Sequence, residues 1–254
     1  MRINLASVAG AVFAFVCWTT LLSAQTDVEA RAAGITQALV KGHVAWKTKL
    51  SSPGAFIRAK EVEREGSLVR YNFYVSGLPV EKLYTALAWP VTQAKPSTMM
   101  EGLSIGKGGI VICAGRTPEQ CSGSQKDDPV DLPFNPTKGE PYRIALEAED
   151  HRVAVVIVPD PISGKDKGCI LSVERLLPRF ELAYFTGTGF PANTEVSFDS
   201  QSYEEKHTVE TKTDSAGSLE FAILPAVTGH TKGTTSIKAV GGSCSPSVKF
   251  DWGH

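Results

Sequence analysis

The stretch Phe185–Phe198, FTGTGFPANTEVSF, places two short segments of strand-forming residues on either side of a Gly-Phe-Pro turn. Gly189 permits a positive φ and Pro191 fixes its own φ, so the two set a corner between strands. A similar order occurs upstream, where Ser76-Gly77-Leu78-Pro79 precedes Leu83–Leu87. The shared order of strand, turn and strand indicates two related β modules, with a chance similarity of turn motifs as the alternative.

Segments rich in Val, Ile, Tyr and Phe recur along most of the chain, separated by Gly, Pro, Asn and Asp, which is the pattern of antiparallel strands. Polar and apolar side chains alternate over residues 68–76, which predicts one buried and one solvated face. Residues 149–151 are predicted as a hairpin turn, and residues 159–167, with two prolines and a charged end, as a linker. The predicted strands are 55–63, 68–76, 82–89, 109–114, 142–148 and 153–158 in a first set, and 169–175, 180–186, 194–198, 207–212, 218–224, 234–240 and 246–252 in a second.

The second set resembles a known family. Phe185–Phe198, followed by Thr213–Leu219 (TDSAGSL) and the stretch Gly229–Val240, is similar to the "GxGFxPxxxVxV … DxxGS" plan of bacterial extracellular immunoglobulin-like domains, including those of IPT/TIG type. The resemblance covers roughly residues 168–254, and its motifs are structural turns. It implies an immunoglobulin-like β-sandwich that serves for binding, spacing or adhesion on an exported protein, with no shared catalytic site. Seven short strands in this part of the chain agree with such a sandwich.

The first 24 residues have the features of a secretory signal peptide. They carry one charge, Arg2, then an apolar run, and end in the small residues Ser23 and Ala24. We expect cleavage after Ala24, with cleavage after Ala30 or retention as a membrane anchor as alternatives. The protein is therefore expected to be secreted or periplasmic, without stable membrane insertion once the signal is removed.

These observations predict an all-β protein made of two tandem antiparallel β-sandwich modules. The expected organisation is a signal peptide (1–24), a helical or disordered lead-in (25–52), a β-sandwich (53–160) and an immunoglobulin-like β-sandwich (161–254). With 26 Lys and Arg against 27 Asp and Glu, the formal charge is -1. The chain thus lacks the basic field that nucleic-acid binding requires.

The cysteines support export. Removal of the signal takes away Cys17 and leaves four, an even number, which favours disulfides in an oxidising compartment. We predict the pairs Cys113–Cys121 and Cys169–Cys244, because each bridge then stays within one module. No Cys-x-x-Cys spacing points to a redox or zinc site.

The pattern Gly102-Leu-Ser104-Ile-Gly106 matches the G-x-S-x-G nucleophile elbow, with Asp150 and His151 downstream. The elbow requires a strand that turns into a helix, whereas Lys107 and two glycines follow here and then a strand-like segment. The same flank argues against an S-x-x-K nucleophile at Ser104 and Lys107. An extracellular hydrolase acting on a polymer, with Ser104 as its nucleophile, stays the alternative function.

Asp127, Asp128 and Asp131 are candidate oxygen ligands for Ca²⁺, although a solvated turn is the favoured interpretation. No cofactor is predicted. The five histidines are scattered without metal-ligand spacing and are interpreted as surface residues: His43, His151, His207, His230 and His254.

Several aromatic residues in predicted strands are candidates for a sugar-stacking platform, but core packing explains most of them. They are Tyr71, Phe73, Tyr74, Trp89 and Trp252. The predicted function is that of an exported, non-enzymatic binding, adhesion or structural protein. Its partner is expected to be a protein or carbohydrate of the envelope or extracellular space, and the sequence identifies neither the partner nor the oligomeric state.

Overall fold

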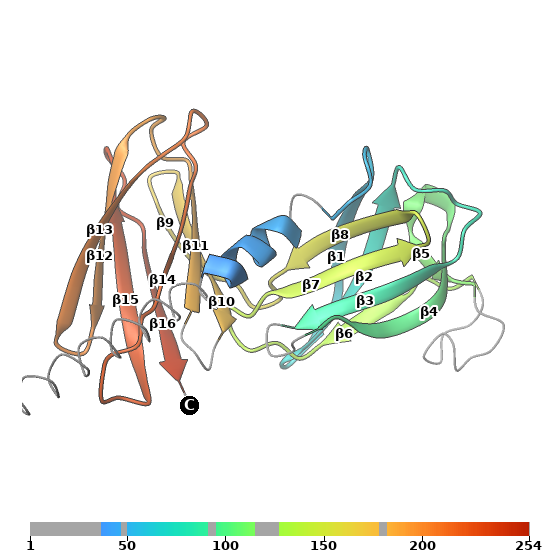
Figure 1. Cartoon of the computed structure of the whole chain (residues 1–254), viewed down its shortest axis with the longest axis horizontal. Helices are drawn as coiled ribbons and strands as arrows, with labels where there is room; N and C mark the ends of the chain where they lie inside the picture. The colour runs from blue at the N-terminus through green and yellow to red at the C-terminus, as the bar shows by residue number, and fades with distance from the viewer. Residues whose placement is uncertain (1–36, 47–49, 91–94, 115–126, 178–181, 254) are drawn as a thin grey trace, which may run out of the picture. The chain divides into compact units, whose positions relative to one another are not determined.

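The computed structural model describes residues 37–46, 50–90, 95–114, 127–177 and 182–253 (Figure 1). The chain divides into two compact units, residues 1–42 and residues 43–254, and the strands all belong to the second unit. The structure is nearly all β, as predicted, and its sheets are antiparallel.

The first β-sandwich consists of a three-stranded and a five-stranded sheet. The smaller sheet has the order β1 (Phe56–Glu65), β2 (Leu68–Ser76), β6 (Asp131–Phe134). The larger has the order β5 (Val111–Cys113), β4 (Ser97–Ile105), β3 (Tyr84–Pro90), β7 (Tyr142–Ala148), β8 (His151–Ile157). Both sheets contribute apolar side chains to one core, including the odd-numbered residues of β2 that the alternation predicts to be buried.

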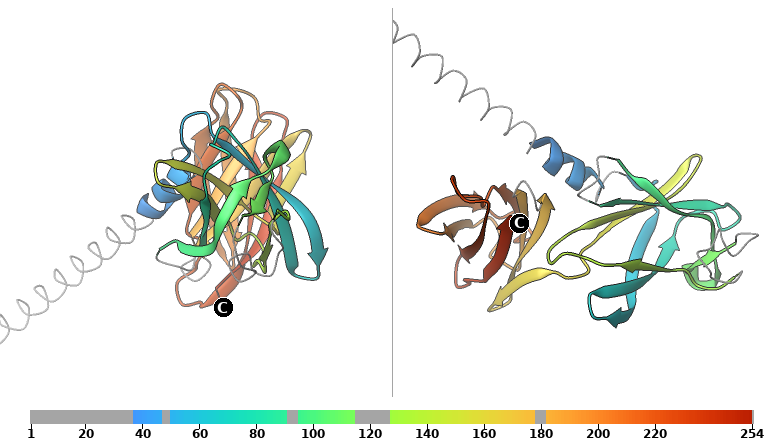
Figure 2. Two further views of the ribbon diagram at one scale, coloured as in Figure 1. Left: turned by 90° about the vertical axis from the view of Figure 1, so that its right-hand side faces the viewer. Right: turned by 90° about the horizontal axis from the view of Figure 1, so that it is seen from below.

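The second β-sandwich consists of two four-stranded sheets. One has the order β14 (Leu219–Ile223), β11 (Leu182–Thr188), β10 (Cys169–Leu177), β9 (Ile162–Asp166). The other has the order β13 (Glu205–Lys212), β12 (Glu195–Ser202), β15 (Lys232–Val240), β16 (Ser247–Gly253). The two sheets face each other as two layers (Figures 1 and 2). Their common core includes Phe185, Phe198 and Phe250.

The two sandwiches repeat one strand order. The sheet β1-β2-β6 corresponds to β10-β11-β14, and β4-β3-β7-β8 corresponds to β13-β12-β15-β16, with β5 and β9 as additions. The Gly-x-Pro corners recur at equivalent places. Gly77 and Gly189 have φ of 76° and 78°, and a Cβ on either would lie 2.3 Å from the carbonyl oxygen of Gly54 or Gly168. The sequence echo therefore marks the same packed corner in both sandwiches.

Alanine substitutions at two glycines of the second corner should lower the stability of the protein by different amounts. Gly168→Ala adds a Cβ into open space and incurs only the left-handed backbone penalty, about 1–2 kcal/mol. Gly189→Ala adds the overlap with a backbone carbonyl, so its free energy of unfolding should fall by about a further 1–3 kcal/mol. Urea unfolding of the two variants measures the difference. Equal losses would show that the corner is not tightly packed.

The predicted linker over residues 159–167 is wrong in its second half. Residues Ile162–Asp166 form β9, which pairs with β10 from Ile162↔Val173 to Asp166↔Cys169. The second sandwich therefore has eight strands instead of seven. Glycine at position 164 lets β9 approach β16 closely, because a Cβ there would overlap the carbonyl oxygen of Ser247 in β16.

A helix over residues 37–46 precedes the strands, within the segment predicted as a helical or disordered lead-in. Gly42 lies inside this helix and does not end it, although glycine costs about 1 kcal/mol there relative to alanine. His43 and Trp46, from its last turn, belong to the second unit and are buried. Trp46 packs on Ala145 and Ala154, on the outer face of β7 and β8.

Candidate functional site

Ser104, the candidate nucleophile, lies within strand β4 and not at a strand-to-helix turn. It is half-buried and pairs with Ile112 of β5. The chain then passes through a 3₁₀ turn, Lys107–Gly109, into β5. The nucleophile elbow needs the amide groups of a following helix to hold an oxyanion. The local fold therefore lacks the context that would make Ser104 a nucleophile.

The acidic group does not lie in a single solvated turn. Asp127 and Asp128 are exposed and run beside β5, where the Asp127 amide donates to Cys113 O at 2.8 Å. Asp131 begins β6, and its carboxylate accepts a 3.0 Å bond from Arg70 of β2. Within the described residues, no three His, Cys, Asp or Glu side chains gather as a metal site would require.

Most of the aromatic residues belong to cores. Tyr71, Phe73 and Trp252 are buried, and the indole of Trp252 donates to Ser202 Oγ at 3.0 Å. Trp89 contacts the Trp46 ring edge-on at 5.6 Å between centroids, and Tyr74 is covered by the Arg58 guanidinium at 4.8 Å. These residues therefore do not form one exposed platform.

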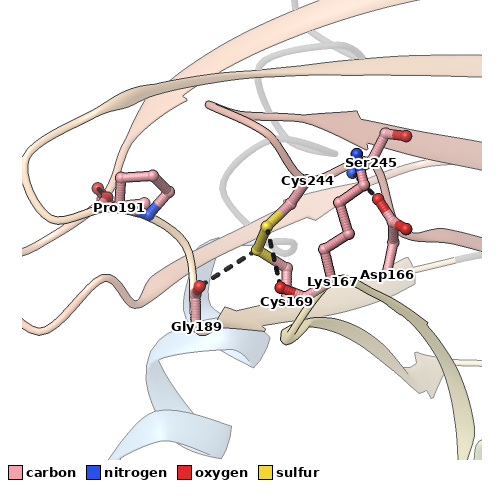
Figure 3. Close-up of a disulfide and its surroundings, with 8 residues drawn as sticks. Asp166, Lys167, Cys169, Gly189, Pro191, Cys244 and Ser245 are labelled. Carbon is pink, nitrogen blue, oxygen red and sulfur yellow. Dashed lines mark hydrogen bonds between the residues drawn. A yellow bond between two sulfur atoms is a disulfide. The ribbon is translucent and has the colours of Figure 1, made fainter.

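The disulfide Cys169–Cys244 is present and joins the start of β10 to the segment between β15 and β16 (Figure 3). Its Cα atoms are 6.0 Å apart, and both residues are buried. Beside it the amide of Ser245 donates to Asp166 Oδ2 at 2.7 Å, which holds this segment against β9. Cys113 is buried in β5, while its predicted partner Cys121 lies outside the described residues, so that pair stays a prediction.

The interpretation of all five histidines as surface residues is wrong for His43, which is 0% exposed. His43 Nε2 lies 2.8 Å from Glu174 Oε2 of β10, and Arg143 of β7 donates from Nε to His43 Nδ1 at 3.3 Å. The ring of Tyr184 in β11 packs edge-on against the imidazole, 5.3 Å between centroids. We call His43, Arg143, Glu174 and Tyr184 the buried polar cluster.

Arg143 and Glu174 lie on opposite sides of the imidazole. Arg143 donates to Nδ1, so that nitrogen accepts the bond, while Nε2 lies in close contact with the Glu174 carboxylate, 2.8 Å from Oε2. His43 thus lies between a guanidinium and a carboxylate. Burial lowers the pKa of Arg143, and Glu174 opposes this shift; burial also raises the pKa of Tyr184, with Glu220 adding to the effect. The sequence held no signal for this cluster, since His43 and Arg143 are 100 residues apart.

The other described histidines lie at the surface. His151 Nδ1 is 2.5 Å from Asp150, His207 Nε2 is 3.4 Å from Glu205, and the His230 ring stacks on Tyr203. His254 lies outside the described residues.

A hollow of about 670 Å³ lies on the outer face of the five-stranded sheet, and we call it the outer-face hollow. It is formed by β3, β4, β7 and the segments beside them. Its lining combines three carboxylates with Thr, Leu and one Lys: Lys82, Leu83, Thr85, Leu87, Thr98, Glu101, Glu147, Ala148 and Glu149.

Ion pairs organise one end of the hollow. Lys82 Nζ lies 2.7 Å from Asp150 Oδ1 in the β7–β8 turn and 3.8 Å from Glu149. The bond from Lys82, then that from His151, lowers the pKa of Asp150 to about 2. Arg152 pairs with Glu147, while Glu101 projects from β4 and is exposed. The lining of the hollow therefore carries more negative than positive charge beside the side chain of Leu83, which is 62% exposed.

No family model matches this chain, and no curated protein matches it. Among solved structures, it is similar to a tetra-tandem repeat from the extending region of a large adhesion protein, with TM-score 0.24 and 11% identity over 78% of this chain and 47% of that one. A second similar structure is the FN1–FN3 domains of chicken CNTN1, with TM-score 0.23 and 9% identity over 78% of this chain and 64% of that one. The chain thus spans about half the length of the first structure and under two thirds of the second.

Within the described residues, no helix is both long and apolar enough to cross a bilayer.

Proposed function

We propose that this protein is an exported, non-enzymatic binding or structural component of the envelope or extracellular space. The observation that carries the proposal is the disulfide Cys169–Cys244, buried in a sandwich whose strand order repeats that of its neighbour. Structural disulfides persist in oxidising compartments. The signal-like N-terminal segment supports the same location.

The outer-face hollow is the binding surface of this proposal. It presents the carboxylates of Glu101, Glu147 and Glu149, and the exposed side chain of Leu83 belongs to its lining. Such a surface complements a protein segment that carries Lys or Arg beside apolar residues, because opposite charges steer the encounter and the apolar contact supplies affinity. A partner protein with a basic, apolar segment is therefore the ligand that we propose.

Photo-crosslinking in cells tests the surface. A photoreactive amino acid at Leu83, in the hollow, is compared with one at Val240, which is 41% exposed on β15 of the second sandwich. We expect a specific adduct from position 83 only, in the exported fraction, and its loss on Glu101→Lys. An adduct with cytosolic proteins, or equal adducts from both positions, would contradict the proposal.

The non-enzymatic part has a separate test. A fluorophosphonate probe labels activated serine nucleophiles covalently. We expect the same background labelling of the wild type and of Ser104→Ala. Labelling that disappears in Ser104→Ala would establish the hydrolase instead.

A further inference from the structure

Strand β13 offers a free edge of eight residues. It is the outermost strand of its sheet, and each of its residues except Thr211 is exposed. The edge strand β8 of the first sandwich, by contrast, is covered. Ser51 and Ser52 hydrogen-bond there to the backbone of Ala154 and Arg152. An uncovered edge strand is a template for pairing with another strand.

Strand β13 carries two opposite charges, Lys206 and Glu210, on one face. The face that carries Thr208 also carries Lys206 and Glu210, whose neighbours across on β12 are the neutral Gln201 and Ser197. Within the described residues, neither Lys206 nor Glu210 forms an ion pair. Between them, Thr208 donates from Oγ1 to the carboxylate of Asp199 on β12 at 2.8 Å. Two opposite charges four residues apart thus lie on one exposed face of an edge strand.

Symmetry restricts how β13 can pair with its own copy. In a two-fold antiparallel pair, facing residues lie on the same side of the sheet, so one residue must face its own copy. When Thr208 faces Thr208, Lys206 faces Glu210 in both directions. Shifting the centre to Val209 sets Lys206 against Lys212, and centres at Lys206 or Glu210 oppose like charges. A centre at His207 places no opposite charges face to face within β13.

We propose that β13 is the contact between two copies of this chain, paired antiparallel about Thr208. The two sheets then form one continuous sheet, with two Lys206–Glu210 ion pairs on one face. On the other face Val209, 41% exposed, faces His207 of the second copy, beside a groove of about 360 Å³ whose lining residues are polar and apolar in equal number and include Leu224 and Val227. The opposite edge of the same sheet, β16, packs against β9 at Gly164 and Ser247. The edge strand β1 of the first sandwich does not suit self-pairing, because its central registers oppose Glu61 with Glu61 or Lys60 with Lys60.

Charge reversal tests this contact in the full-length chain by sedimentation equilibrium over a concentration series. Lys206→Glu and Glu210→Lys each place like charges opposite one another twice, so each should weaken the dimer about tenfold or more. The double variant K206E/E210K restores opposite charges and should restore the dimer. A monomeric wild type, or a dimer that the single reversals leave unchanged, would overturn the proposal; the second result would also indicate association through another surface, such as the apolar N-terminal stretch.

Disulfide trapping tests the register independently. Thr208→Cys places two thiols opposite each other at the two-fold axis and should form a covalent dimer on mild oxidation. Lys206→Cys should not crosslink with itself, but should crosslink when mixed with Glu210→Cys. Covalent dimer from Lys206→Cys alone would show a different register and refute the proposed pairing. The contact does not depend on the outer-face hollow, so loss of either proposal leaves the other in place.

Discussion

Replacing Cys169 and Cys244 together with alanine is expected to lower the free energy of unfolding of the second sandwich by about 4.5 kcal/mol. The bridge closes a sequence separation of 75 residues, which contains β10 to β15. Opening that loop returns conformational freedom to the unfolded chain. Because a domain's net stability is itself about 5–15 kcal/mol, this variant should lie close to its folding limit.

Hydrogen exchange measured by mass spectrometry localises the effect. Peptides from β12, β15 and β16 should lose most of their protection, whereas peptides from β2 and β3 in the first sandwich should change little. Wild-type protein treated with a reductant lacks the bond but keeps both cysteines, so it is the matched control for the second sandwich. Because the reductant would also open the predicted Cys113–Cys121 bridge, peptides of the first sandwich are compared only between the double variant and untreated wild type. Unchanged protection of β15 and β16 in both samples would mean that the sandwich does not depend on the bridge.

The second large effect concerns the buried polar cluster. His43→Leu removes the bridge between Arg143 and Glu174 and leaves a guanidinium and a carboxylate buried without it. We expect a loss of about 3–5 kcal/mol, the usual cost of breaking a buried ionic contact. Urea unfolding, read through the fluorescence of Trp46 and Trp89 close to the cluster, measures this loss.

A triple variant, His43→Leu with Arg143→Met and Glu174→Met, distinguishes the cost of lost polar contacts from the cost of lost side-chain packing. Replacing a whole buried ionic group by apolar residues is often neutral or stabilising. The triple variant should therefore be more stable than His43→Leu alone. If the two are equally unstable, the loss comes from packing of the imidazole against Tyr184 and not from its contacts with Arg143 and Glu174.

Local sequence signals predicted the parts of this fold that depend on neighbouring residues. The alternation along β2 follows from the period of a strand, which places Val69, Tyr71, Phe73 and Val75 on one buried face. The turn at residues 149–151 follows from its polar residues between two strand-forming segments. The corners at Gly77 and Gly189 follow from the positive φ that glycine adopts readily.

Other elements could not be predicted because distant partners decide them. Residues Ile162–Asp166 contain glycine and charges, the composition of a linker, yet they pair with β10 and pack against β16. Strand β4 interrupts its apolar pattern with Glu101 and Gly102, and it exists because β3 and β5 bond to it on both sides. In each case backbone pairing outweighs a weak local preference.

The same distinction between local and distant causes applies to the fold class, the disulfide and the two polar clusters. The amino-acid sequence alone predicts the all-β class and the repeated corner, because periodicity and glycine conformation are properties of the chain. Four cysteines allow three pairings, and the division into two modules selects Cys169–Cys244 among them. Only the tertiary structure buried His43 between Arg143 and Glu174 and left Lys206 and Glu210 together on an open edge. Burial and edge position depend on which strands become neighbours, and that choice is made by packing between segments far apart in the sequence.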